Sequence, residues 1–501
     1  MTAAAPRHIG IRFSPTLAFL VLSFHFSAAQ VAAAADRTKT EEPTVVLSPD
    51  MDIQEQVDSH PAGTKFLLKP GVYRRQTIDP KDGQQFIGED GATLSGSMLL
   101  TDWEYDADKA VWIASGLPPE LEPSGECDRR YPLCGYREDL FVDGVPLRRV
   151  TARYQLTEKT WIARRGTAVI ATDPAGKIVE LSVTPFAFHG EARNVVIDNV
   201  IVEKYAPPAQ FGAIDARGGH GWILRNVTAR WNHSLGIFID PWMEVVGGAA
   251  SNNGQLGIGG TAHGAVIDGM EIAENNYANF DWRWEAGGAK FAFTDKLVVK
   301  NTCVRDNNGP GLWTDIDSSG VIYEKNKVFN NIGPGIKHEI SYATTIRDNI
   351  VAGNGKGGRK NFLWGSQIQI QNSSDANVYD NLVEVAPTYG NGISMIYQDR
   401  RSEETGKRYA TTANNVHNNT IVFLGDAGQA GLVSDADDPS FWTKDQNSFD
   451  QNTYVVPTDA EKRWIIRNGA VTWPQYQAAG YEPNGRLVVE ARDPVALSCV
   501  D

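Results

Sequence analysis

The sequence predicts an all-β fold, a solenoid of the parallel β-helix kind, on three observations. Short β-branched runs such as "VVIDNVIV" and "LVVKNTCV" recur with strand periodicity. Glycine-aliphatic steps recur at short intervals, 21 residues from Gly236 to Gly257 and 24 from Gly311 to Gly335. Asparagine pairs such as Asn307-Asn308 stand between the runs, where Asn tolerates the left-handed backbone of a turn. This period gives about three short strands per coil, and stacked coils bury one continuous core.

The N-terminus has the pattern of a secretory signal peptide over residues 1–35. Arg7 and Arg12 precede an apolar run over 17–26 and small residues up to Ala35. That run is too short to span a bilayer, and no later run is long enough. We therefore expect a secreted or periplasmic protein without a membrane span.

The net charge is strongly acidic, which excludes nucleic acid as a partner. The formal charge of the 501-residue chain is −14. Removing residues 1–35 takes away two arginines and no acids, so the mature chain carries −16. Nucleic acid and anionic membrane both require clustered cations.

The remaining chain divides into four expected parts. Residues 44–100 are expected to form an N-terminal cap and the first coils. Residues 101–185 break the repeat and show hairpin patterns such as "LFVDGVPLRRV", which predicts a small β-rich insertion. Residues 186–440 carry the repeat and are expected to form the β-helix core with its active groove. Residues 441–501 are expected to form a C-terminal cap.

Four cysteines are few for an exported chain. Cys127 and Cys134 flank six residues in a loop with Pro and Gly, which predicts a local disulfide. Cys303 lies inside an apolar strand pattern, as a buried small hydrophobic residue does. Cys499 is either free or paired with Cys303.

The stretch from Asp52 to Ser97 resembles the start of the pectate-lyase-like proteins. It contains a helical segment that would cap the core and then "GTKFLLKPGVY" as the first coil. This resemblance implies a right-handed parallel β-helix. It does not imply one reaction, because this scaffold hosts lyases, hydrolases, epimerases and proteins without catalytic activity.

Alignment of the coils on the aliphatic residue after each glycine predicts two columns of side chains. The inward column consists of Ile237, Ile258, Leu312, Ile336, Ile368 and Ile393. Strand alternation directs the next residue of each coil outward. This outward column consists of Phe238, Gly259, Trp313, Lys337 and Gln369, with Lys290 expected to join it.

Two carboxylates occupy equivalent positions in the copies "GPGLWTDID" and "GPGIKHEIS", namely Asp315 and Glu339. Stacked coils are separated by about 4.8 Å. Retaining glycosidases need two carboxyl groups about 5 to 5.5 Å apart. Mutual repulsion at this separation raises the pKa of one group and keeps it protonated as an acid. The repeat therefore predicts a catalytic pair.

The stretch from Gly311 to Val351 resembles the catalytic coils of β-helix glycoside hydrolases of the β-xylosidase kind. In that family a Trp-x-Asp stretch carries the nucleophile, and a Glu one coil later carries the acid/base. The resemblance implies that Asp315 is the nucleophile and Glu339 the acid/base. The sequence departs from the family pattern at Asp317, where a second acid follows.

A set of polar and aromatic residues is expected to bind the substrate around this pair. Trp313 offers a face for a sugar ring, and the insertion "NFDWRWEAGG" adds aromatic and acidic side chains one coil earlier. His338 and His233 are expected to be structural. The expected substrate-binding residues are Trp313, Lys337, Lys290, Asp317, Trp282, Trp284, Glu285 and Gln369.

We therefore expect a secreted retaining glycoside hydrolase that degrades a polysaccharide or oligosaccharide without a cofactor or metal. It should hold the carboxyl groups of Asp315 and Glu339 about 5 to 6 Å apart in an open groove. Two alternatives stay open. A polysaccharide lyase or epimerase would use Lys290, Lys337 or Arg347 as its base, with or without calcium bound by Asp315, Asp317 and Glu339. A non-catalytic β-helix would only bind carbohydrate. The sequence does not specify the oligomeric state.

Overall fold

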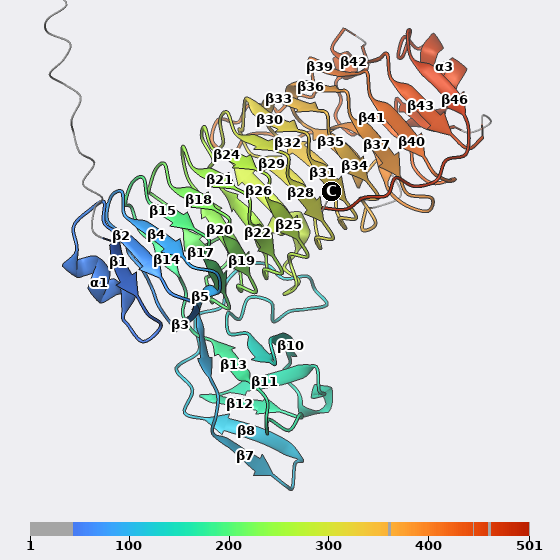
Figure 1. Ribbon diagram of the computed structural model, residues 1–501. Coiled ribbons are helices and arrows are strands. Elements are labelled where there is room, and N and C mark those ends of the chain that lie inside the picture. Colours follow the sequence, from blue (N-terminus) through green and yellow to red (C-terminus); the bar gives the residue numbers. More distant parts are fainter. Residues whose placement is uncertain (1–43, 359–361, 444, 459–461, 500–501) are drawn as a thin grey trace, which may run out of the picture. The chain divides into compact units, whose positions relative to one another are not determined.

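The computed structural model describes residues 44–358, 362–443, 445–458 and 462–499. The predicted signal peptide lies outside these residues. The described chain winds through three long sheets, named A, B and C here. Along most of the coil, consecutive strands belong to different sheets, and each strand pairs with the equivalent strand of the next coil (Figure 1). Within sheets A and B all pairs are parallel, and in sheet C only the terminal pair β44–β45 of the described strands is antiparallel. The predicted solenoid is confirmed.

The three sheets have the following strands in order. Sheet A contains β1 (Thr44–Leu47), β2 (Lys65–Leu68), β4 (Gln85–Gly88), β15 (Val196–Asp198), β18 (Ile223–Arg225), β21 (Glu244–Val246), β24 (Val266–Asp268), β27 (Val298–Lys300), β30 (Val321–Glu324), β33 (Tyr342–Arg347), β36 (Ser374–Tyr379), β39 (Asn414–His417) and β42 (Asn447–Asp450). Sheet B contains β3 (Gly71–Arg74), β5 (Ala92–Ser95), β16 (Ile201–Glu203), β19 (Thr228–Arg230), β22 (Ala249–Ser251), β25 (Glu271–Ala273), β28 (Cys303–Arg305), β31 (Lys327–Phe329), β34 (Ile350–Ala352), β37 (Leu382–Val385), β40 (Thr420–Phe423), β43 (Thr453–Val456) and β46 (Arg486–Val489). Sheet C contains β14 (Phe188–His189), β17 (Gly212–Asp215), β20 (Leu235–Ile239), β23 (Leu256–Gly260), β26 (Gly287–Ala292), β29 (Leu312–Asp315), β32 (Ile336–Glu339), β35 (Ser366–Gln371), β38 (Asn391–Tyr397), β41 (Ala430–Ser434), β44 (Trp464–Ile466) and β45 (Gly469–Val471).

A separate eight-stranded sheet forms between β5 and β14 in the sequence (Figure 1). Its strands are antiparallel neighbours except for the parallel pair β10–β11. In spatial order they are β6 (Ser97–Leu99), β13 (Val179–Ser182), β9 (Leu140–Val142), β10 (Val145–Arg149), β11 (Thr160–Arg164), β12 (Thr167–Ile170), β8 (Val111–Ser115) and β7 (Trp103–Asp106). This sheet has its own small core, which includes Trp161 and Leu181.

An ion pair joins the insertion to the coil, and a disulfide closes a loop within the insertion. Lys204, which follows β16, places its Nζ 2.5 Å from Oε2 of Glu180 in β13, and both side chains are buried. Cys127 and Cys134 form a disulfide in the loop between β8 and β9.

Few helices accompany the strands. They are α1 (Ile53–Ser59), α2 (Trp282–Glu285) and α3 (Trp473–Ala478), with the 3-10 segments η1 (Arg153–Gln155) and η2 (Pro439–Trp442). Helix α1 begins at the N-cap Asp52, whose side chain accepts from the backbone N of Glu55 at 3.1 Å, and it buries Ile53 and Val57 against the core. No described helix is long and apolar enough to cross a membrane.

The coil continues beyond the predicted boundary at residue 440. Strands β42, β43 and β46 still pair in parallel with sheets A and B. Helix α3 then buries Trp473 and Tyr476 at this end of the core. The segment 441–501 therefore includes the last strands of the coil as well as a cap, because its short runs still direct apolar residues, Phe449, Tyr454 and Val456, into the main core.

The predicted inward column of sheet C is confirmed by the strand register. Its residues pair in consecutive coils, are at most 1% exposed and belong to the main core. They are Ile237, Ile258, Ala289, Leu312, Ile336, Ile368 and Ile393. The register shows that Ala289 fills the place in the coil that the sequence alignment left open.

Two asparagine ladders line the turns inside the coil. In each, Nδ2 of one amide donates to Oδ1 of the residue in the next coil, at 2.8 to 3.1 Å. The first consists of Asn232, Asn253, Asn275, Asn307, Asn331 and Asn354, and the second of Asn326, Asn349, Asn381, Asn419 and Asn452. Glu482 ends the second ladder, because its Oε1 accepts from Nδ2 of Asn452 at 2.7 Å.

The C-terminal tail returns over the outer face of sheet B. Cys499 forms a disulfide with Cys303 of β28, across 196 residues of sequence. The backbone N of Val495 donates to Oε2 of Glu384 at 3.0 Å, and Leu497 packs against Phe329. Cys303 is therefore buried as predicted, but by a disulfide to the tail rather than as a free thiol.

Candidate active site

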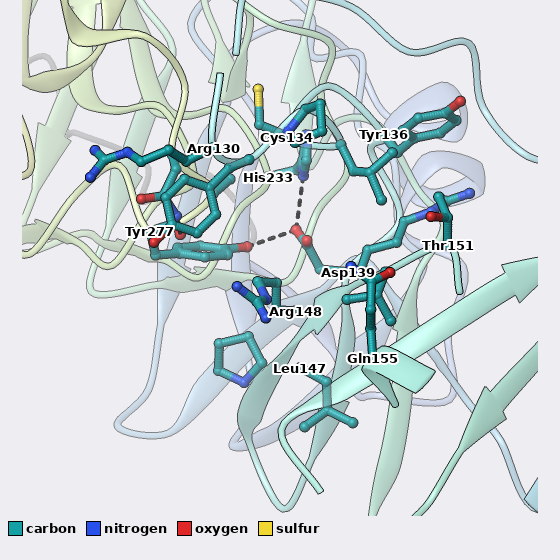
Figure 2. Close-up of a pocket in the computed structure, with 18 residues that line it drawn as sticks. Arg130, Cys134, Tyr136, Asp139, Leu147, Arg148, Thr151, Gln155, His233 and Tyr277 are labelled. Carbon is teal, nitrogen blue, oxygen red and sulfur yellow. Dashed lines mark hydrogen bonds and ion pairs between the residues drawn. The ribbon is translucent and has the colours of Figure 1, made fainter. Parts of the chain in front are cut away.

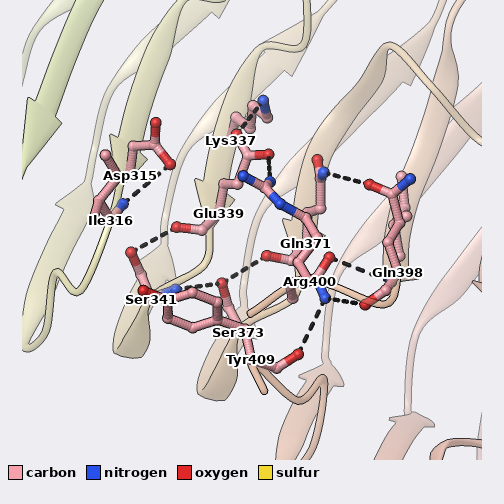
Figure 3. A network of polar contacts seen from close by, with 12 residues as sticks. Asp315, Ile316, Lys337, Glu339, Ser341, Gln371, Ser373, Gln398, Arg400 and Tyr409 are labelled. Atoms are coloured by element: carbon pink, nitrogen blue, oxygen red, sulfur yellow. Dashed lines mark hydrogen bonds and ion pairs between the residues drawn. The ribbon is translucent and has the colours of Figure 1, made fainter. Parts of the chain in front are cut away.

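Asp315 and Glu339 end the adjacent strands β29 and β32 of sheet C. In the register Thr314 pairs with His338, and both of these side chains are fully buried on the inward side. The next residue of each strand therefore faces outward. Adjacent strands lie about 4.8 Å apart, so the two carboxylates stand one coil apart on the outer face of sheet C (Figure 3).

The glycines that precede these strands are required by close backbone approach. A Cβ at Gly311 would lie 2.6 Å from the carbonyl oxygen of Gly335. A Cβ at Gly335 would lie 2.5 Å from Cγ1 of Val351. The frame repeats because successive coils stack too closely for a side chain there. This close stacking also fixes the positions of Asp315 and Glu339 along the axis of the coil.

Trp313 lies between two lysines in the outward column. Lys290, Trp313 and Lys337 pair in consecutive coils, as predicted for this column. Both Nζ atoms lie 4.1 Å from the centroid of the Trp313 ring, which is cation–π geometry. The ring is only 2% exposed. The expectation that Trp313 offers a face to a sugar is therefore not met, because the lysines occupy that position.

The same lysines pair with the carboxylates. Nζ of Lys290 lies 3.0 Å from Oδ2 of Asp315 and 3.4 Å from Oε2 of Glu285. Lys337 forms an ion pair with Oε2 of Glu339, and Arg400 pairs with its Oε1 (Figure 3). Glu339 therefore has two cationic partners, whereas Asp315 has one.

Arg400 is a residue of the site that the repeat pattern does not reveal. It lies in the loop between β38 and β39, 61 residues after its partner Glu339. The stretch "YQDRRSEETGKRY" contains several basic residues and no repeat pattern. Such a loop is typical of the wall of a binding groove, but its sequence does not indicate which arginine contacts the carboxylate pair.

The surroundings shift the pKa values of the two carboxyl groups in opposite directions. Burial raises the pKa of Asp315, and the charge of Glu339 raises it further against the opposing charges of Lys290 and Lys337. Burial also acts to raise the pKa of Glu339, but Lys337 and Arg400 outweigh it and lower this pKa. The free protein therefore favours a proton on Asp315 and a charge on Glu339.

Neither carboxylate stands in an open groove. Asp315 is 6% exposed and Glu339 is 5% exposed, although both face outward. Arg400 lies over Glu339 and is itself more exposed. The sequence predicts an open groove, whereas in the structure cationic side chains cover both carboxylates. The reason is that both carboxylates have charge partners close enough to screen them from water.

Comparison with known proteins supports the fold. The family described as "Right handed beta helix region" matches residues 212–375. The chain is a right-handed parallel β-helix protein. A search of the curated proteins gave no match. The structure of XylC in complex with xylose has a TM-score of 0.65 at 14% identity, covering 90% of this chain and 87% of that chain.

Two further solved β-helices align at lower scores. The A-module of the mannuronan C-5 epimerase AlgE6 from Azotobacter vinelandii has a TM-score of 0.43 at 13% identity, with 88% of this chain and 94% of that chain covered. A structure titled "Glycoside hydrolase" has a TM-score of 0.38 at 9% identity, with 78% of this chain and 96% of that chain covered. At these identities the likeness concerns the fold alone.

The two tryptophans of α2 pack against neighbouring residues of the protein rather than projecting into the solvent. Trp282 and Trp284 contact a small cluster that includes Phe280 and Ala286. The backbone oxygen of Trp284 accepts from Nζ of Lys290 at 3.2 Å. Of the predicted residues in this insertion, Glu285 comes nearest to the carboxylate pair, through its contact with Lys290.

A glutamine row continues from the pair toward later coils. Gln369 pairs with Lys337 in the register, and its Nε2 donates to Oε1 of Gln371 at 2.9 Å. Gln371 in turn donates to Oε1 of Gln398 at 3.0 Å. Oε1 of Gln369 has no hydrogen-bond partner within the described residues, although it is buried. A hydroxyl group of a ligand could supply the missing donor.

Asp317 and His338 lie near the carboxylate pair but in different surroundings. Asp317 follows β29 in a left-handed conformation, with φ of 52°, and accepts from the hydroxyl of Tyr342 at 3.4 Å. His338 points inward, and burial lowers its pKa to about 4. A neutral buried imidazole is a structural residue here, as expected. No cluster of three or more His, Cys, Asp or Glu side chains suited to a metal ion occurs within the described ranges.

Proposed function

We propose that this protein is a carbohydrate-active enzyme, a retaining glycoside hydrolase that acts through Asp315 and Glu339. One observation carries the proposal. Two outward carboxylates stand one coil apart, and their surroundings separate their pKa values, raised at Asp315 and lowered at Glu339. A retaining glycosidase needs one ionised and one protonated carboxyl group about 5 to 5.5 Å apart, and the strands that carry this pair are neighbours about 4.8 Å apart.

The charge partners favour a definite division of roles. Glu339, held ionised by Lys337 and Arg400, attacks the anomeric carbon and forms a glycosyl ester. Asp315 donates its proton to the leaving glycosidic oxygen, and it later removes a proton from the water that hydrolyses the ester. This division is the reverse of the one that the family resemblance implies. Trapping the ester decides between them.

A lysine-based lyase or epimerase fits this site less well. A base must be neutral before it removes a proton. Burial acts to lower the pKa of Lys290, but Glu285 and Asp315 outweigh it and raise this pKa. Lys337 forms an ion pair with Glu339 and lies over the face of Trp313, so a substrate would have to break both contacts to reach it. Calcium binding would likewise require that Lys290 and Lys337 leave their ion pairs with Asp315 and Glu339.

Two further observations support the proposal. The aligned XylC structure contains xylose, so β-xylosides are the first substrates to test. Both disulfides and the N-terminal pattern of residues 1–35 favour a secreted or periplasmic location.

The test is hydrolysis of a panel of aryl glycosides and oligosaccharides. We expect Asp315→Asn and Glu339→Gln each to lower kcat by about a thousandfold or more, since each removes a group that reacts in the transition state. Asp375→Asn, at an exposed position of β36 in sheet A, is the matched control and should retain most activity. If both variants keep wild-type rates, or if the product is an unsaturated uronate that absorbs in the ultraviolet, the hydrolase proposal is wrong.

A 2-deoxy-2-fluoro glycoside with a good leaving group tests the division of roles. This substrate forms the ester faster than water removes it. Mass spectrometry of peptides should find the label on Glu339. A label on Asp315 would instead support the division that the resemblance implies, and would refute the assignment from the ion pairs.

A further inference from the structure

A cavity lies where the insertion meets the coil (Figure 2). Its volume is about 350 Å³, and its lining comes from parts of the segment 130–155 of the insertion together with His233 and the segment 277–279 of the coil. None of the residues of the carboxylate pair or its ion partners lines it. A cavity of this size is within the range that holds small ligands, about 300 to 1,000 Å³.

Asp139 presents a charged oxygen to this cavity. Its Oδ2 accepts from Nδ1 of His233 at 3.0 Å and from the hydroxyl of Tyr277 at 2.7 Å (Figure 2). Its Oδ1 has no hydrogen-bond partner among the described residues, and its side chain is 14% exposed. The two donors hold the carboxylate in place and leave one oxygen as an acceptor for a ligand.

Arg148 supplies the complementary donor. It lines the same cavity, its side chain is exposed, and it forms no ion pair among the described residues. The other arginines of the lining are already paired. Arg130 binds Asp128, and Arg149 binds Glu120 and Glu138.

Aromatic rings complete the lining. Tyr131 and Tyr136 are half-buried, and the guanidinium of Arg149 covers Tyr136 at 4.1 Å from its centroid. Tyr131 lines the same cavity, and the guanidinium of Arg130 lies farther from its ring, at 5.8 Å from the centroid. An aromatic face beside polar groups suits a molecule that has an apolar side and several hydroxyls.

The charges of the cavity favour a neutral ligand. One open carboxylate oxygen and one unpaired guanidinium offset each other. An anion would be attracted by Arg148 but repelled by Asp139, and a cation would be attracted by Asp139 but repelled by Arg148, so a singly charged ligand gains little from the pair. The hydroxyls of a sugar instead donate a hydrogen bond to Asp139 and accept one from Arg148. We propose that this cavity is a second carbohydrate-binding site, which takes a neutral pyranose and is distinct from the carboxylate pair.

The two sites share one segment of chain. Tyr277 binds Asp139 in the cavity, and a few residues later Glu285 binds Lys290 beside Asp315. A ligand in the cavity therefore contacts the segment that positions one wall of the active site. This placement suits a site that holds a neighbouring unit of a longer saccharide or a second chain.

The experiment measures binding without turnover. The full-length Asp315→Asn/Glu339→Gln protein is titrated with methyl β-D-xylopyranoside and methyl β-D-glucopyranoside by saturation-transfer NMR. Galacturonate and glucosamine serve as the anionic and cationic probes. We expect saturable binding of a neutral probe, weakened at least fivefold by Arg148→Ala or Tyr131→Ala in the same background. Because hydrolysis is not measured, failure of the proposed reaction does not affect this result.

Arg164→Ala is the matched control, because Arg164 is an exposed arginine of the insertion that does not line the cavity. It should bind the neutral probes like its parent. Circular dichroism establishes that each variant is folded. The proposal is overturned if no neutral probe binds, if only a charged probe binds, or if folded Arg148→Ala and Tyr131→Ala bind as tightly as Arg164→Ala.

Discussion

Glu482 should make the stability of the C-terminal coils depend on pH. This side chain is fully buried at the end of the second asparagine ladder. Its carboxyl group accepts from the backbone N and Nδ2 of Asn452 at 3.1 and 2.7 Å, and from the hydroxyl of Tyr454 at 3.1 Å. Burial outweighs these donors and raises the pKa of Glu482 to about 7, from 4.5.

The sign and size of the effect follow from proton linkage. Between pH 4.5 and about 7 the folded protein binds a proton that the unfolded chain has released. The contribution to stability is therefore fully present below pH 4.5 and is lost as the pH rises through 7. At about 1.4 kcal/mol for each pH unit, the loss in the free energy of unfolding is about 3 kcal/mol.

Urea unfolding at pH 5 and pH 8, at constant ionic strength, measures this loss. Glu482→Gln keeps the shape of the side chain and cannot ionise, so it should remove most of the difference between the two pH values. Glu490→Gln, at an exposed position of the same region, is the control and should behave as the wild type. If wild type and Glu482→Gln lose the same stability between the two pH values, Glu482 is not the group responsible and the reasoning fails.

Two further changes test the site and the tail. Arg400→Ala removes a charge that lowers the pKa of Glu339, so the acidic limb of the kcat/KM profile should move up by about one pH unit; Arg401→Ala is the control, and an unmoved limb would contradict the ionised role of Glu339. Replacing Cys303 and Cys499 by Ser opens a loop of 196 residues and should lower the free energy of unfolding by about 5 kcal/mol. Opening the seven-residue disulfide of the insertion should cost about 2 kcal/mol, and equal losses would contradict the dependence on loop length.

Much of the fold could be predicted because a solenoid repeats its local rules. A glycine that allows close stacking, an aliphatic residue that enters the core and an asparagine at the turn recur in each coil. The register of Leu312 with Ile336, and of Trp313 with Lys337, follows from this periodicity alone. The same periodicity places Asp315 and Glu339 on one face.

The surroundings of the pair could not be predicted, because they depend on contacts between segments distant in sequence. Arg400 reaches Glu339 from a loop without repeat pattern. Trp313 was expected to be open because its position is outward, yet two neighbouring lysines cover its faces. Alternation specifies the side of a strand, whereas exposure depends on what the loops and long side chains place over it.

The returning tail changes how the stack can come apart. In a linear solenoid each coil contacts only its neighbours, so the end coil can peel away first and the next can follow. Here the last residues are tied to Cys303 in β28, many coils from the end. The coils between these two cysteines then form one covalently closed loop, so the end coil stays tethered to β28 when it separates. Such closure protects a protein against proteases, because partial opening is the step that exposes a chain to cleavage.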